Sequence, residues 1–399
     1  MSAARNALPS DGARNTVSQG LDRTTVLPTY ARADLTIVRG KGCRVWDDRG
    51  TAYLDFGGGI AVVGLGHRHP AVTAAAHAQL DRLWHASNLY WTEPMLELAE
   101  LLSERAGGAQ AFFCSSGAEA NEAALKVARK ATGRPRLVAL EESFHGRTLG
   151  ALSVTGQPAK WEGFGPLVPG VSFARANDVE SLEAAVSPGG DVAAIVLEPV
   201  LGEGGVVPLE EAFVLAAAEI AREVGALLWL DEVQSGVGRT GTFFAYEQLG
   251  VEPDLVTLAK ALGNGLPVGA LLVRAGAADA VGPGDHGATF GGNPVACAAA
   301  CAVVRAIDES LLANVVARGG QLAAGLVALA GVEAVRGRGL MLAAALDRDV
   351  GPVVDACRHE GLLVLTAGSQ PSVLRLLPPL VVSEAEIDDA LAILRVVLG

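Results

Sequence analysis

The chain has 399 residues and carries 31 basic against 44 acidic side chains, which gives a formal net charge of −13. This charge argues against nucleic acid or an anionic membrane surface as a partner. Half of the residues are hydrophobic, but the longest apolar run, 295–304, is far short of the roughly 18 residues that span a bilayer. Five cysteines without tight paired spacing favour a cytoplasmic location, and the length suits about two domains.

The first 69 residues divide into a tail and a short N-terminal segment. Residues 1–20 are rich in Ser, Arg, Asn, Gly and Pro, lack the apolar core of a signal peptide, and are expected to be disordered. A transit peptide stays open as an alternative, although no amphipathic period supports it. Within residues 21–69, the stretches 39–50 and 53–56 predict two short strands around an Asp-Arg-Gly turn.

Strand-like runs alternate with helical periods through residues 70–291, which predicts a large α/β domain with a mostly parallel sheet. The runs that we interpret as strands are 111–114, 136–140, 193–198, 226–230 and 255–259.

A smaller α+β domain is expected over residues 292–399. Its pattern is a long Ala-rich helix, a βα unit and a final amphipathic helix over 383–398. Cys297 and Cys301 lie one helical turn apart on the first helix. We expect them to pack in the core, because no further ligand cluster suggests a metal site.

Residues 114–122, Cys-Ser-Ser-Gly-Ala-Glu-Ala-Asn-Glu, follow a predicted strand and open a helix. Serine is a good N-cap, Gly117 permits close backbone approach, and Glu119 favours the first turn. Free backbone N–H groups at such a helix start form a phosphate site. Most isolated Ser-Gly helix starts are only caps, but the preceding strand and an acid–amine pair further along favour the functional interpretation.

The stretch 142–148 follows the next strand and offers two side chains suited to a flat, charged ligand. Phe144 could stack on a planar cofactor, and Arg147 could clamp a carboxylate through two hydrogen bonds. For either residue alone, a packed phenylalanine or a surface arginine would be the simpler interpretation.

Glycines and apolar residues surround three further candidates, Glu203, Thr289 and Arg375. Glu198 ends a strand, and Glu203 lies between glycines, where it can be held near a charged partner. Thr289 precedes a Gly-Gly turn and could add a hydroxyl to a phosphate shell. Arg375 is embedded in apolar sequence, and a buried arginine requires an anion from the protein or from a ligand.

An aspartate and a lysine each stand at the end of a buried-strand signal. Asp231 follows Ala-Leu-Leu-Trp-Leu, and Lys260 follows Asp-Leu-Val-Thr-Leu-Ala. Ligands of parallel sheets bind outside the carboxyl ends of the strands, so both groups are expected in one crevice. Such a pair suits pyridoxal 5'-phosphate (PLP), because lysine forms a Schiff base with the aldehyde and aspartate pairs with the protonated pyridine nitrogen.

Lysine is rare in this chain, which has five: Lys41, Lys126, Lys130, Lys160 and Lys260. Arginine cannot replace a Schiff-base lysine, since its guanidinium stays protonated. A lysine retained among Leu, Ala and Gly is therefore less readily explained as a solvated charge.

Together these segments resemble the class III aminotransferases, PLP enzymes of fold type I, over more than nine-tenths of the chain from about Leu27 onward. The resemblance implies an α/β fold with a mostly parallel central sheet in the large domain and a smaller C-terminal α+β domain. Several segments look like the acetylornithine aminotransferase branch in particular. They are 27–30, 56–62, 65–70, 87–90, 144–153, 231–241 and 282–294.

The resemblance also implies roles for individual residues. Lys260 and Asp231 are the catalytic pair. The cofactor-binding set adds Ser116, Gly117 and Ala118 at the phosphate, Phe144 on the ring face, His145, Gln234 near the ring hydroxyl, and Thr289 from a partner subunit. The substrate-binding set is Tyr30 and Arg147 for the donor's carboxylate, Arg375 for the α-carboxylate of glutamate or 2-oxoglutarate, and Glu203, which pairs with Arg375 when that site must be neutral.

One departure from the family stands at Ala118, where threonine or serine is usual. One hydroxyl contact to the phosphate is therefore missing, whereas backbone N–H contacts survive. We expect weaker PLP retention and the same chemistry.

The implied reaction is transfer of the δ-amino group of N2-acetylornithine to 2-oxoglutarate, giving N-acetylglutamate 5-semialdehyde and glutamate in arginine biosynthesis. A homodimer with a shared active site is expected, without nucleic acid, membrane or metal. Ornithine δ-aminotransferase, or a succinylornithine or succinyldiaminopimelate aminotransferase, is the alternative, because motifs do not fix the acyl pocket.

Three other classes of protein fit less well. A NAD-dependent dehydrogenase lacks its Gly-x-Gly-x-x-Gly pattern at Gly57-Gly-Gly. A Schiff-base aldolase would not need Asp231 or the phosphate-type helix start, and a PLP-binding regulator would need a DNA-binding segment.

Overall fold

The computed structural model describes residues 23–187 and 189–399, so the predicted disordered tail, 1–20, lies outside the described residues. Its largest sheet has seven strands in the order β4-β12-β11-β10-β7-β5-β6. β12 runs antiparallel to both neighbours, and the other pairs run parallel, which confirms the predicted α/β fold with a mostly parallel sheet. In chain order, these strands are β4 (Gln110–Cys114), β5 (Arg136–Leu140), β6 (Val171–Ala174), β7 (Val192–Leu197), β10 (Leu227–Asp231), β11 (Leu255–Leu258) and β12 (Gly269–Val273).

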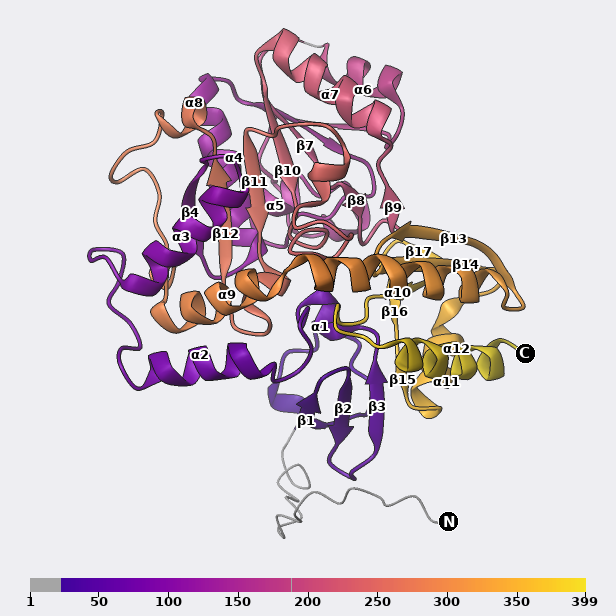
Figure 1. Ribbon diagram of the computed structural model, residues 1–399. Coiled ribbons are helices and arrows are strands. Elements are labelled where there is room, and N and C mark those ends of the chain that lie inside the picture. The colour runs from indigo at the N-terminus through magenta and orange to yellow at the C-terminus, as the bar shows by residue number, and fades with distance from the viewer. Residues whose placement is uncertain (1–22, 188) are drawn as a thin grey trace, which may run out of the picture.

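Helices cover both faces of this sheet (Figure 1). Successive side chains of a strand point to opposite faces. Thus Trp229 packs in the core beneath α4 (Gly117–Thr132), whereas Leu228 and Leu230 pack in the core shared with α6 (Val179–Val186) and α7 (Glu211–Val224). This two-sided burial explains the near-continuous apolar runs of these strands. It also sends Asp231, two residues after Trp229, toward α4.

A second sheet joins segments from both ends of the chain, in the order β1-β2-β3-β15. Its strands are β1 (Ile37–Lys41), β2 (Arg44–Asp47), β3 (Ala52–Asp55) and β15 (Leu362–Leu363). β3 and β15 pair in parallel, with Leu54 opposite Leu362. The N-terminal strands are thereby bonded to the C-terminal part of the chain.

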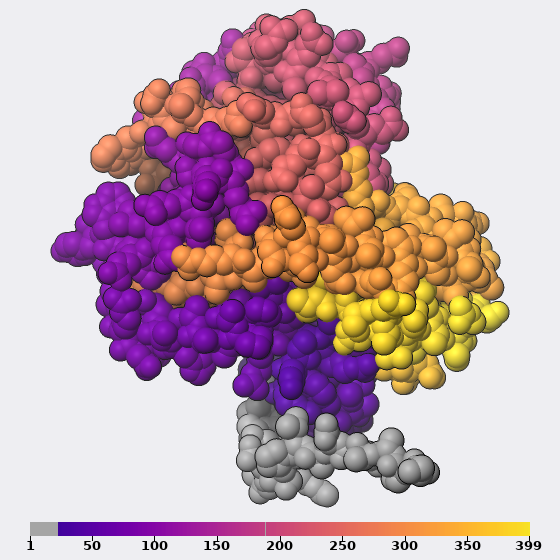
Figure 2. All heavy atoms as spheres, in the orientation of Figure 1, coloured from indigo at the N-terminus to yellow at the C-terminus, as the bar shows by residue number. Residues whose placement is uncertain are grey.

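A third, antiparallel sheet belongs to the C-terminal part, in the order β13-β14-β17-β16. It consists of β13 (Val332–Arg338), β14 (Met341–Leu346), β16 (Leu365–Ala367) and β17 (Gln370–Leu376), and its helices are α10 (Glu309–Val327), α11 (Val350–His359) and α12 (Glu384–Leu398). In Figure 2 these orange and yellow segments lie between the red part of the large sheet and the indigo N-terminal strands. The division into 21–69, 70–291 and 292–399 stays a prediction.

The remaining elements connect or cover these sheets. α9 (Pro294–Ala306) packs against α2 (Pro70–Leu80) and α3 (Glu93–Arg105). Cys297 and Cys301 of α9 are buried in the main core, as the sequence predicted.

The short elements are α1 (Gly58–Ala61), α5 (Leu149–Ser153), α8 (Ala275–Ala278), β8 (Val200–Leu201), β9 (Val207–Pro208) and the 3-10 turns η2 (Arg23–Thr25), η3 (Pro158–Lys160), η4 (Ala245–Gln248) and η5 (Lys260–Gly263). Among the described residues, no helix combines the length and apolar character needed to cross a bilayer.

The last helix, α12, begins with a reciprocal cap that provides a stability test. The hydroxyl of Ser383 accepts the N–H of Glu386 at 3.3 Å, and the carboxylate of Glu386 accepts the N–H of Ser383 at 2.9 Å. We expect Ser383→Ala to lower the free energy of unfolding by ~1 kcal/mol in urea denaturation, because the N–H of Glu386 loses its side-chain acceptor at the helix start.

Ser383→Thr keeps the hydroxyl acceptor and is the matched control, with an expected change below about 0.5 kcal/mol. Equal losses in both variants would contradict the capping role.

Candidate active site

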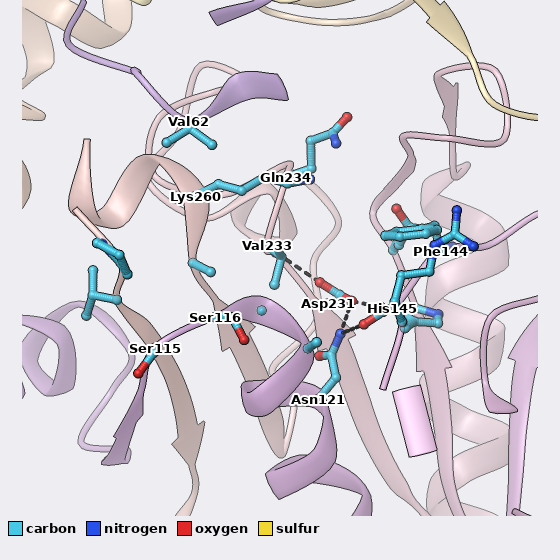
Figure 3. A pocket seen from close by; sticks show the side chains of 18 of the residues that line it. Val62, Ser115, Ser116, Asn121, Phe144, His145, Asp231, Val233, Gln234 and Lys260 are labelled. Atoms are coloured by element: carbon cyan, nitrogen blue, oxygen red, sulfur yellow. Dashed lines mark hydrogen bonds and ion pairs between the residues drawn. The ribbon is translucent and has the colours of Figure 1, made fainter. Parts of the chain in front are cut away.

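The carboxyl ends of the parallel strands border a cavity of about 390 Å³ (Figure 3). Its lining comes from the turns that follow β4, β5, β7, β10 and β11. Asp231 and Lys260 both line it, so the acid and the amine singled out in the sequence do meet in one crevice. This is the edge at which open α/β sheets bind their ligands.

Asp231 is 4% exposed and is held by three donors. Its Oδ2 accepts from Nδ1 of His145 at 2.7 Å and from Nδ2 of Asn121 at 2.8 Å, and its Oδ1 accepts the N–H of Val233 at 3.0 Å. Figure 3 draws these contacts as dashed lines. A buried carboxylate needs such compensation, and the three hydrogen bonds fix the direction of this one.

A second buried carboxyl, Glu198, lies close enough for its charge to act on His145. Burial by itself lowers the pKa of His145, but the hydrogen bond to Asp231 and the charges of Asp231 and Glu198 outweigh it and raise that pKa. Burial raises the pKa of Glu198 to about 7, although the N–H groups of Phe144 and Gly202 donate to it at 2.8 and 3.1 Å. Two buried carboxyls therefore lie in this site, and burial raises the proton affinity of Glu198.

Lys260 follows β11 and begins η5 with a φ of +45°, a left-handed conformation that costs energy in a residue with a side chain. Burial lowers the pKa of its amine to about 8, and the charge of Arg375 acts in the same direction. Among the described residues, this amine makes no ion pair or hydrogen bond. A half-buried, unpaired amine with a lowered pKa is a nucleophile near neutral pH.

The start of α4 has the features expected of a phosphate site. Ser116 is the N-cap, and its hydroxyl accepts the N–H of Glu119 at 3.2 Å. Gly117 and Ala118 occupy the first two helical positions, which leave their N–H groups without an acceptor inside the helix. A Cβ on Gly117 would lie 2.7 Å from Cγ1 of Val233, so only glycine fits beside the turn after Asp231.

Phe144 and Arg147 lie together on the turn after β5. Both line the cavity, and the guanidinium carbon of Arg147 lies 5.6 Å from the centre of the Phe144 ring. Arg147 is exposed and makes no ion pair among the described residues. A flat aromatic face and an unpaired guanidinium thus stand at the same wall, as a planar cofactor and a carboxylate substrate require.

Arg375 of β17 has an internal anion. It is 3% exposed, its Nη2 lies 2.7 Å from Oε1 of Glu203, and its Nη1 donates to Oε1 of Gln234 at 3.4 Å. A Cβ on Gly202 would lie 2.4 Å from that same Gln234 oxygen, so this glycine makes room for the glutamine. Glu203 and Gln234 line the cavity, which links the ion pair to it.

Two candidate residues do not reach the cavity of the single chain. Tyr30 is 70% exposed, and Thr289 is exposed on the turn before α9. The other candidates line the cavity or contact residues that do.

Sequence reasoning missed the roles of two residues of the site, Asn121, which donates to Asp231, and Glu198, whose charge acts on His145. Asn121 belongs to the quoted stretch 114–122, and its place on the buried face of α4 was the available signal. Glu198 carried the same signal as Asp231, an acid at the end of an apolar strand.

The arrangement fits PLP. It offers an ionised acid, an unpaired amine, an aromatic face and a helix start with free N–H groups, all around one cavity.

Comparison with known proteins agrees with this chemistry. The family model "Aminotransferase class-III" matches residues 28–398. The "Acetylornithine aminotransferase" of Listeria monocytogenes is 47% identical over 378 residues, covering 94% of this chain and 97% of the relative. The crystal structure of N-acetylornithine aminotransferase from Stenotrophomonas maltophilia has a TM-score of 0.79 at 38% identity, covering 92% of this chain and 96% of that one. The ornithine aminotransferase of Toxoplasma gondii has a TM-score of 0.90 at 33% identity, covering 94% and 93%.

These similarities confirm the family resemblance, the enzyme class and, through the family, the cofactor PLP. By the extent of the match and the geometry of its site, the chain belongs to the class III aminotransferases.

Proposed function

We propose that this enzyme transfers the δ-amino group of N2-acetylornithine to 2-oxoglutarate, with PLP as its cofactor. The observation that carries the proposal is the meeting of Asp231 and Lys260 in one cavity beside a phosphate-type helix start. The similarity to acetylornithine aminotransferases supports the acetylated donor. Ornithine is the second candidate donor, because the backbone also matches an ornithine aminotransferase closely.

PLP, when bound, supplies an electron sink for the electron pair released as the donor loses a proton from Cδ. Asp231 would pair with the protonated ring nitrogen of the cofactor, and its three internal donors leave room for this fourth one. Lys260 moves the proton away from Cδ, which its lowered pKa favours. Phe144, His145 and Gln234 hold the ring, and Ser116, Gly117 and Ala118 hold the phosphate.

The two substrates require opposite charge states at one position. 2-Oxoglutarate brings a carboxylate to the reacting end, and the δ-carbon of N-acetylornithine does not. We infer that Arg147, with Tyr30, binds the carboxylate of N-acetylornithine while the Glu203–Arg375 pair stays closed. The pair opens when the α-carboxylate of 2-oxoglutarate takes the place of Glu203 on Arg375.

We further propose a homodimer whose active sites are shared. An exposed apolar surface supports this, since such patches mark interaction sites. Its residues are Leu83, Trp84, Leu89, Tyr90, Trp91 and Phe290, each at least 41% exposed. Asn293 donates to the carbonyl of Trp84 at 2.8 Å, so this surface adjoins the turn that carries Thr289. Burial of this surface against a second copy would bring Thr289 to the partner's phosphate site.

Two further expectations stay proposals. A small C-terminal domain that begins near residue 292 would border the cavity through Arg375. A cytoplasmic location is supported by Cys43, Cys114, Cys297, Cys301 and Cys357, which are all free thiols.

The donor is tested by mixing the PLP-loaded enzyme with N-acetylornithine or ornithine, without a keto acid, and following the cofactor's visible band. We expect rapid bleaching with N-acetylornithine and much slower bleaching with ornithine. Preference for ornithine would move the assignment to the second donor. A protein that gains no band after addition of PLP would contradict the cofactor itself.

The pKa of Lys260 predicts how the apoprotein takes up PLP. The amine is nucleophilic only when neutral, so the uptake rate should rise about tenfold per pH unit below a midpoint near 8 and level off above it. Stopped-flow absorbance measures this rate. Arg375→Gln should move the midpoint upward, because it removes a cation that lowers this pKa. A midpoint near the ordinary lysine value of 10.5 would contradict the assignment.

The Glu203–Arg375 pair predicts an asymmetric variant. Glu203→Ala should slow the N-acetylornithine half-reaction on the order of tenfold and spare the glutamate half-reaction, because Arg375 stays unpaired only in the first. Single-turnover kinetics of each half separate the two. Glu210→Ala, which removes an exposed acid, is the control. Equal slowing of both halves would exclude the switch.

A further inference from the structure

A second unpaired cation stands beside Arg147. Lys160 ends η3, is half-buried, and places its amine nitrogen 5.9 Å from the centre of the Phe144 ring. The guanidinium carbon of Arg147 lies 5.6 Å from the same ring centre. Both cations therefore lie beside the same aromatic ring, which lines the cavity.

Lys160 has no partner that would explain its position. Among the described residues its amine makes no ion pair or hydrogen bond, whereas Lys126 donates to the carbonyl of Asp285 and Lys130 forms an ion pair with Asp285. Burial lowers the pKa of the Lys160 amine, and the charge of Arg147 lowers it further, while Glu203 and Glu142 act in the opposite direction. Two neighbouring cations repel each other, so the fold holds the Lys160 amine at a position where the positive charge of Arg147 opposes its own.

Gly368 locates the amine relative to the rest of the site. A Cβ on Gly368 would lie 2.8 Å from Oε2 of Glu203 and 3.4 Å from Nζ of Lys160. The amine thus lies near Phe144 and Glu203, two residues that line the cavity.

The segment that carries Lys160 is anchored to the turn that carries Phe144. The N–H of Lys160 donates to the carbonyl of Gln157 at 2.9 Å, and Nε2 of Gln157 donates to the carbonyls of Glu142 and Ser143 at 3.1 and 3.2 Å. Nε1 of Trp161 donates to the carbonyl of Thr155 at 2.8 Å. The backbone of Lys160 therefore keeps its place relative to Phe144, as a substrate-reading residue requires.

We propose that Lys160 selects acylated donors. The proposal rests on the proposed function, in which Arg147 binds the donor's α-carboxylate. The group on the α-nitrogen then lies beside Lys160. In an acylated donor this group is a neutral amide, whose carbonyl oxygen accepts a hydrogen bond from the amine. In ornithine it is an ammonium, which the amine repels. One side chain thereby supplies an attractive contact to the correct donor and a repulsive one to the wrong donor.

The chemical class selected is an α-carboxylate with a neutral or anionic acyl group on its nitrogen. A succinyl group, which ends in a carboxylate, should be accepted at least as well as an acetyl group, because its charge is opposite to that of Lys160. This order of preference distinguishes selection by the charge of Lys160 from selection by a pocket that depends only on the size of the acyl group.

The test compares kcat/KM for N-acetylornithine, N-succinylornithine and ornithine in the wild-type holoenzyme and in Lys160→Gln. We expect the ratio of N-acetylornithine to ornithine to fall about tenfold in Lys160→Gln, through loss of the first substrate and gain of the second. Lys160→Arg should keep the ratio within about threefold, because the charge remains. Lys41→Gln, which removes an exposed lysine of β1, is the matched control and should leave the ratio unchanged.

Each other outcome overturns the inference. An unchanged ratio of kcat/KM for N-acetylornithine to that for ornithine in Lys160→Gln would mean that the amine does not distinguish the groups on the α-nitrogen. A proportional loss with both donors would mean a structural role. A wild-type enzyme that prefers ornithine would refute the proposed donor and this selection together, whereas a wild type that prefers N-acetylornithine with an unchanged ratio in the variant would refute the selection alone.

Discussion

The site depends on a carboxylate that is almost fully removed from water. A buried carboxylate needs hydrogen-bond donors in place of water, and three N–H groups point at Asp231. Those groups come from the turn after its own strand, from α4 and from the turn after β5. The sheet, the helix on its face and the neighbouring strand end must all be in place before this anion is stable. The stability of the buried carboxylate therefore depends on the complete fold around it.

The positions of the central acid and amine could be predicted from the sequence, because both residues stand at the ends of apolar strand runs. Asp231 and Lys260 were found since apolar runs mark buried parallel strands, whose carboxyl ends share an edge. The strands β6 and β12 were not predicted. β12 reads Gly-Ala-Leu-Leu-Val and runs antiparallel to its neighbours, a direction that no local pattern specifies. The pairing of β3 with β15 was equally hidden, because it joins residues about three hundred positions apart in sequence.

Contacts of side chains are harder to predict than positions of strands. Nothing in the sequence says that Asn121 donates to Asp231, since the angle at which α4 crosses the sheet decides which helical residue faces the acid. The same holds for Arg375. Its apolar surroundings required an anion, but the sequence left open whether protein or ligand supplies it. Glu203 fills that role at 2.7 Å, and glycines at 202 and 368 leave the space that this geometry needs.

The Glu203–Arg375 pair also acts on Lys260. The charge of Arg375 lowers the pKa of the lysine and that of Glu203 raises it, so the two members of the closed pair act in opposite directions. Withdrawal of Glu203 would leave the cation alone and favour the neutral amine further. An arriving carboxylate would then restore the balance. The ion pair thus couples the charge of the second substrate to the proton affinity of the residue that moves protons.

The choice of donor cannot reside in the backbone. The structure superposes better on an ornithine aminotransferase than on an N-acetylornithine aminotransferase, although the latter is more similar in sequence. The two donors differ at the α-nitrogen, which is an ammonium in one and a neutral amide in the other. A pocket for the acetyl methyl group would discriminate by only ~1–3 kcal/mol. A fixed positive charge beside that nitrogen would repel the ammonium of ornithine but not the neutral amide of the acylated donor. A few side chains near Arg147 would then be enough to make two enzymes of the same fold prefer different donors.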